Sequence, residues 1–205
     1  MSTTTTGTKK VMLYTEQTPN PEALKFVLNR MLYKGAADFS DQELAQDWSP
    51  LAAALHEFPY VQGVFISNNF VSITKEMNYS WSDIMLKLKE FIKNYVQEGN
   101  PIIKDGFEEV REQIEEERGL GVEYAEEDAE IAKKIIELLD QYVKPAVEMD
   151  GGNIEFKKFK DGKVTLELQG ACSGCPSSTV TLKSGIEGML KRMVPQVKEV
   201  VALME

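Results

Sequence analysis

The sequence predicts an α+β fold: two small domains, each with sandwich-like layers of sheet and helix, joined by an acidic linker. Segments that alternate with period two, as half-buried strands do, interleave with segments of helical periodicity. The negative charge is concentrated between them, since residues 101–130 hold 12 Asp and Glu against 3 Lys and Arg in a chain of net charge −10. We therefore assign 9–98 to a first domain, 99–127 to the linker and 128–205 to a second domain.

The first domain contains four segments predicted as strands, three of which alternate with period two, and two segments predicted as helices. Ser49 and Pro50 begin one helix, as its cap and its first helical residue. The pair Asn68-Asn69 tolerates positive φ and joins two strands. Proline and glycine mark the ends of the other predicted elements. Proline has no N–H to donate, and glycine readily adopts the left-handed backbone conformation that ends a helix. The predicted elements are strands at 11–18, 24–29 and two within 63–75, and helices at 49–58 and 80–99.

The acidic linker has few apolar residues. We predict one helical stretch over 107–118, between Gly106 and Gly119. Dense charge of one sign favours a solvated, extended or loosely helical segment. We interpret it as a spacer about which the two domains move independently, in preference to an acidic recognition tail.

The second domain is predicted to have the order α-β-β-α-β and a three-stranded sheet. Pro145 bends or interrupts its first helix, and Asp161-Gly162 is a strong signal for a two-residue hairpin turn. The last strand returns through a right-handed strand–helix–strand crossover. The predicted elements are helices at 128–147 and from Pro176, and strands at 154–159, 163–169 and 197–205.

The stretch QGACSGCPSS, residues 169–178, holds both cysteines of the chain, Cys172 and Cys175. It lies between a predicted strand end and a predicted helix start, where free N–H groups and the helix dipole favour thiolates. Two thiolates at this spacing can bind a metal or exchange disulfides. The other interpretation, two small buried hydrophobes, fits poorly with the flanking glycine and proline residues.

A metal site at these cysteines lacks ligands within one chain. Zinc and iron–sulfur clusters usually take four protein ligands, whereas this chain offers two thiols. Its single histidine, His56, lies in the other domain and is interpreted as a core-edge or surface residue. A two-fold dimer would place four thiolates around one shared cluster. On the residues alone, a shared cluster, a thiol–disulfide oxidoreductase and a dimeric zinc protein all stay open.

Composition excludes some classes of protein. No run of about 18 apolar residues is present, so we expect no membrane span. Neither flank of the linker has the basic excess that phosphate binding needs, so we expect no nucleic-acid partner. The first ten residues lack the apolar core of a secretory signal and the arginines of a transit peptide. We therefore expect a reducing compartment and a cytoplasmic location.

The segments MDGGNIEFKKF, DGKVTLELQGACSGCPSSTVTLKSGIEGMLK and VKEVVALM closely resemble the C-terminal NifU domain. TPNPEALKFVLN and SPLAAALHEFPYVQGVFISNNFVSITK resemble the Nfu N-terminal domain. In this order the two are similar to an Nfu-type iron–sulfur scaffold or carrier. The resemblance implies a non-enzymatic homodimer, formed through the C-terminal domain, that binds a [4Fe–4S] cluster through Cys172 and Cys175 and donates it to apo-proteins. A [2Fe–2S] cluster is also compatible with four thiolates. For the first domain it implies a part in target recognition or stability.

Overall fold

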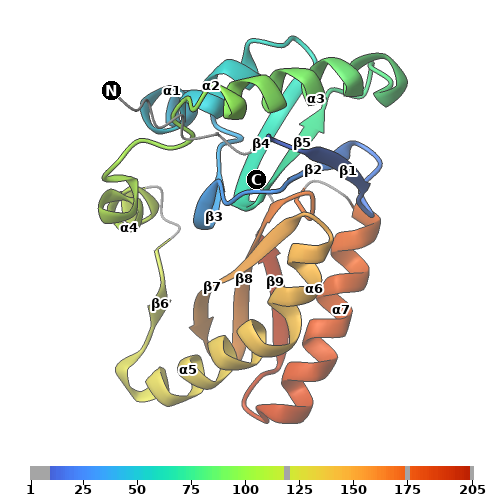
Figure 1. Ribbon diagram of the computed structural model, residues 1–205. Helices are drawn as coiled ribbons and strands as arrows, with labels where there is room; N and C mark the ends of the chain where they lie inside the picture. Colours follow the sequence, from blue (N-terminus) through green and yellow to red (C-terminus); the bar gives the residue numbers. More distant parts are fainter. Residues whose placement is uncertain (1–9, 118–120, 174–175, 204–205) are drawn as a thin grey trace.

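The computed structural model describes residues 10–117, 121–173 and 176–203. It contains two sheets, each with its own helices packed on one face (Figure 1). No helix in the described part of the chain is long and apolar enough to cross a membrane. The predicted mixed fold of two helix-covered sheets is therefore confirmed, while the domain limits stay predictions.

The first sheet and its helices occupy the N-terminal part of the chain (Figure 1). The five strands pair antiparallel in the order first, second, fifth, fourth, third. The elements are β1 (Leu13–Gln17), β2 (Ala23–Leu28), β3 (Tyr33–Asp38), α1 (Gln42–Trp48), α2 (Pro50–His56), β4 (Val61–Asn68), β5 (Phe70–Lys75) and α3 (Trp81–Gln97).

Each predicted element of the first sheet is present, and two further ones are found. Asn68 has φ +45°, as the predicted β4–β5 turn requires. The unpredicted β3 carries two small residues and Gly35 at φ +124°, and its register shifts against β4, so its sequence shows no alternation. The unpredicted α1 has Asp41 as its cap, whose carboxylate accepts hydrogen bonds from the N–H groups of Glu43 and Leu44.

The acidic linker forms α4 (Phe107–Glu117), close to the predicted helix. Phe107 is 4% exposed and packs on the rings of Phe39 and Trp48 in the first core. Farther along α4, Glu115 pairs with Lys157 of the second sheet. The interpretation as a solvated spacer is therefore wrong for this helix, because one apolar turn and one charged turn attach it to both sheets.

The second sheet has four strands, not the predicted three. The additional strand comes from the segment that we assigned to the linker. It is two residues long, too short for a periodic signal, and it pairs parallel with the first long strand. The elements are β6 (Glu123–Tyr124), a 3-10 turn (Glu126–Asp128), α5 (Ala129–Leu138), a π-helical turn (Leu139–Val143), α6 (Lys144–Met149), β7 (Gly152–Lys160), β8 (Lys163–Gly170), α7 (Pro176–Met193) and β9 (Glu199–Leu203).

The order of the main elements of the second domain is confirmed. β7 and β8 form the predicted hairpin, with Asp161 and Gly162 at φ +55° and +84°. The helix is interrupted before Pro145 by the π-helical turn, because proline offers no N–H to the preceding turn. After α7, β9 pairs parallel with β8, as a strand–helix–strand return requires.

Glu187 connects α7 to the edge strand β9. Its carboxylate accepts hydrogen bonds from Lys191 Nζ at 2.6 Å and from the Val200 N–H at 3.0 Å. These two bonds, with Lys191 the larger cause, hold the pKa of Glu187 below its usual 4.5. The carboxylate therefore stabilises the fold above the unfolded pKa, and this contribution is lost as pH falls through the lower folded pKa.

We expect the NMR titration of the Glu187 carboxyl carbon to have its midpoint below 4.5. Lys191→Met removes the larger cause and should move the midpoint up toward the usual value. A midpoint at or above 4.5 in the unaltered protein would contradict the geometry.

Candidate functional site

The cysteine loop, residues 170–175, lies in the sequence between the end of β8 and the start of α7, as predicted, and the structure describes its residues 170–173. Gly170 turns the chain at φ +65°. Its carbonyl accepts hydrogen bonds from the Ser173 N–H at 3.1 Å and the Ser173 hydroxyl at 2.8 Å. The side chain of Cys172 is 7% exposed and joins the core of the second domain. Cys175 lies outside the described residues.

The cysteine loop lies closely on the start of β7. A Cβ atom at Gly152 would be 2.5 Å from the Gln169 carbonyl oxygen and 2.9 Å from Cys172 Sγ. Real Cβ atoms do not approach so closely, so only glycine lets the loop come this near. The sequence gives no sign of the contact between Gly152 and Cys172, because it depends on the β7–β8 pairing.

Cys172 is the sequence-predicted ligand that the structure describes. Within the described ranges, no three or more His, Cys, Asp or Glu side chains gather into a group that could hold a metal ion. His56 is in the first domain, where its Nε2 donates to the Phe39 carbonyl at 2.7 Å and its Nδ1 is buried without a hydrogen-bond partner. His56 was predicted to be a core-edge or surface residue, and the structure places it at the core edge.

Residues of the first domain hold the cysteine loop, and sequence reasoning did not find them. Asp38 Oδ2, at the end of β3, accepts a hydrogen bond from the Gly170 N–H at 2.9 Å. Asn20 is 4% exposed, and its Nδ2 donates to the Ser173 carbonyl at 3.4 Å. Neither the burial of Asn20 nor its partner is visible in the sequence, so no local signal could have found this contact.

Two polar side chains of the first sheet contact the segment that precedes β7. Ser72 Oγ donates to the Gly151 carbonyl at 2.6 Å. Lys25 Nζ donates to the carbonyls of Glu148 at 3.0 Å and Met149 at 3.2 Å, the last residues of α6. A cation is favourable there, because the final carbonyls of a helix have no partner within the helix.

A buried charge cluster lies on the face of the second sheet opposite its helices. Lys157 Nζ is within 3.0 Å of carboxylate oxygens of Glu155 and Glu167 and 2.9 Å from that of Glu115, and its side chain is 3% exposed. Burial alone would lower the pKa of Lys157, but the charge of Glu155, the hydrogen bond to Glu115 and the charge of Glu167 together raise it above its usual value.

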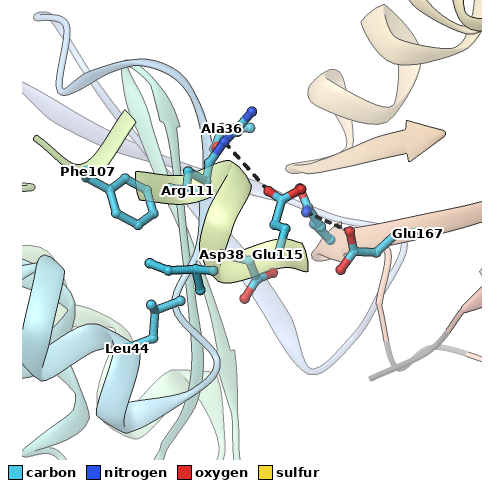
Figure 2. A pocket seen from close by; sticks show the side chains of 10 residues that line it. Ala36, Asp38, Leu44, Phe107, Arg111, Glu115 and Glu167 are labelled. Carbon is cyan, nitrogen blue, oxygen red and sulfur yellow. Dashed lines mark hydrogen bonds and ion pairs between the residues drawn. The ribbon is translucent and has the colours of Figure 1, made fainter. Parts of the chain in front are cut away.

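The cluster borders a small cavity of about 60 Å³ between the two sheets. Figure 2 shows Arg111 and Glu115 of α4 beside Glu167 of β8, with Asp38 of β3 on the same cavity. Arg111 Nη1 donates to the Ala36 carbonyl at 3.1 Å. The charges of this wall are paired: Arg111 and Glu115 of α4 contact Glu155 and Lys157 of β7.

Comparison with known families matches both parts of the chain. Residues 13–99 match the family described as "Scaffold protein Nfu/NifU N terminal". Residues 135–201 match the family described as "NifU-like domain", and this range contains the cysteine loop.

Curated relatives match nearly the whole chain. The "NFU1 iron-sulfur cluster scaffold homolog, mitochondrial" of Drosophila erecta is 37% identical over 196 residues, which are 95% of this chain and 65% of that protein. The "NifU-like protein 4, mitochondrial" of Arabidopsis thaliana is 37% identical over 198 residues, 95% of this chain and 67% of that protein. The chain thus spans about two thirds of the length of these relatives.

Both relatives are named mitochondrial, so the prediction of a cytoplasmic location is wrong.

Among solved structures, a solution structure of a NifU-like protein from Saccharomyces cerevisiae is 22% identical to this chain. It covers 51% of this chain and 94% of its own, with a TM-score of 0.43.

Proposed function

The chain belongs to the Nfu/NifU family of iron–sulfur cluster scaffold proteins, and from this premise we propose that two copies share one [4Fe–4S] cluster. Cys172 and Cys175 of each copy are the proposed ligands. The cluster is cargo: it is built on or received by the pair and then given to apo iron–sulfur proteins. Following its relatives' names, we infer that the protein works in mitochondria.

The observation that carries the proposal is the place of Cys172. Its thiol lies where β8 ends, before the first turn of α7, and the described residues offer no further group of ligands beside it. Thiolates are the soft ligands that iron–sulfur clusters take. With two per chain, a pair of chains completes the usual set of four.

The proposed transfer of the cluster to apo-proteins follows from its position between two chains. A cluster held between two chains has half its protein bonds to each, so separating the chains exposes it to a recipient's thiolates. A cluster bound by four ligands of one chain could not be exposed in this way. We therefore propose a carrier without catalytic turnover. A [2Fe–2S] cluster fits the same four thiolates and is distinguished by its iron content.

Anaerobic reconstitution of the full chain with iron and sulfide tests the proposal. We expect about four irons and four sulfides per dimer. The protein should be brown, with a visible absorption band, and its solution mass should be that of two 23.1-kDa chains. Mössbauer spectroscopy then separates the two cluster types. A colourless protein that retains only zinc, or a metal-free protein that reduces insulin with turnover, would contradict it.

A further inference from the structure

The first sheet is buried on both faces, although helices cover only one of them. The inner face packs Leu24, Phe26 and similar residues against α1, α2 and α3. We call the other side the outer face (Figure 1). Its central residues are at most 8% exposed; they are Lys25, Val27, Phe65, Phe70 and Ser72.

Two glycines touch this outer face: Gly170, the first residue of the cysteine loop, and Gly151, which precedes β7. A Cβ atom at Gly170 would be 2.7 Å from the Phe65 ring. A Cβ atom at Gly151 would be 2.7 Å from Ser72 Oγ. Both glycines have positive φ, +65° and +84°, so close approach and backbone conformation both require glycine. The outer face therefore fits the loops of the second domain without space for another chain between them.

The contact reaches the proposed cluster site directly. Gly170 is the first residue of the cysteine loop, and Cys172 follows two residues later. Asp38 binds the Gly170 N–H, and Asn20 binds the Ser173 carbonyl. With Phe65 against Gly170, the first sheet occupies one side of this loop.

We propose that the outer face of the first sheet is a reversible cover for the cysteine loop: closed in the cluster-free chain, and moved aside before the loops of two chains share a cluster. This rests on the proposed function. The contact consists of hydrogen bonds to backbone groups and one small apolar cluster, Val27, Phe65 and Phe70. Interfaces of this polar kind between domains of one chain commonly open. The ion pairs of α4 add to the closed state and are left unchanged in the test.

Thiol alkylation of a Cys175→Ser chain tests the cover independently of any cluster. The single remaining thiol, Cys172, is 7% exposed and packs in the core of the second domain, between the covered residues Gly170 and Ser173. Its reaction with iodoacetamide requires the loop to loosen from that core, which the contacts of the first sheet to the loop oppose, so the rate follows the open population. Ser72→Ala removes the Gly151 hydrogen bond and should raise that rate about fivefold, the factor typical for one net hydrogen bond. Lys25→Met removes the bonds to α6 and should act in the same direction, and the double variant should exceed either single one.

Ser67→Ala is the matched control. Ser67 is 1% exposed, and its Oγ donates to the Gly35 carbonyl at 2.8 Å, a bond within the first sheet. It should leave the alkylation rate unchanged. If Ser72→Ala and Lys25→Met react no faster than Ser67→Ala, the cover is overturned.

Reconstitution of the same variants with both cysteines present completes the test. We expect Ser72→Ala to assemble a cluster-bound dimer faster than Ser67→Ala. Faster alkylation with no cluster in any variant would overturn the proposed function and support the cover. Normal clusters formed at equal rates by all variants would overturn the cover and support the function.

Discussion

Cys172→Ser is expected to abolish assembly of a stable cluster in the reconstituted protein. Serine replaces a thiolate with a hydroxyl that stays protonated at neutral pH, and oxygen is a harder ligand than the sulfur that these clusters take. In a shared site each substitution removes two ligands at once, one from each chain. Iron and sulfide content, the visible absorption band and the solution mass should all fall to the values of the cluster-free chain.

Ser173→Ala is the matched control for this loss. It alters the neighbouring residue of the same loop and removes the hydroxyl hydrogen bond to the Gly170 carbonyl, but it leaves both thiols. We expect its iron content to match that of the unaltered protein. Circular dichroism should show both variants folded. If Cys172→Ser or Cys175→Ser retained about four irons per dimer, the assignment of the ligands would be wrong.

Lys157→Met is expected to lower the free energy of unfolding by about 3 kcal/mol. Methionine keeps the length of the side chain but removes the charge, which leaves Glu115, Glu155 and Glu167 facing one another. This loss lies at the lower end of the range for breaking a buried ion pair. The side chains of Glu115 and Glu155 are 22% and 18% exposed, so water screens their charges in part. Urea unfolding measures the loss through the transition midpoint.

Lys158→Met is the control for Lys157→Met. The two lysines are neighbours on β7, but Lys158 is 37% exposed and pairs with Glu123, which is 64% exposed. An exposed pair contributes little, so stability should hardly change. Equal effects of the two substitutions would show that the buried cluster contributes no more than a surface ion pair.

The pH dependence of the Lys157 contribution has a definite sign. Its folded pKa is raised above the unfolded value of about 10.4. The stabilisation is therefore fully present below that value and is lost as pH rises through the folded pKa. The stability difference between the unaltered protein and Lys157→Met should accordingly be the same at pH 7 and pH 9.

Local chemistry made much of the fold predictable. Asn68-Asn69 and Asp161-Gly162 adopt backbone conformations that few other pairs tolerate, so both hairpins could be predicted from the sequence. The helix interruption ahead of Pro145 follows from its missing N–H. β3 and β6 were missed for the opposite reason: one carries a register shift and the other has two residues, so neither produces a period.

The sequence by itself determined the pair of thiols, their position between strand and helix, and their insufficiency for a cluster within one chain. Each of these depends on residues close together in the chain. The contact between the outer face of the first sheet and the cysteine loop could not be predicted in this way. Period-two alternation shows which residues share a face of a strand, but not whether anything lies on that face.

Only the tertiary structure decided what lies on the outer face. Ser72 meets Gly151 across 79 positions, and Asp38 meets Gly170 across 132. Contacts over such separations leave no local pattern, because each partner only has to be polar or small at its own position. In the same way, Lys157 is one more charged residue of a strand in the sequence. Only the fold brings Glu115 of α4 and Glu167 of β8 beside it, next to Glu155 of its own strand.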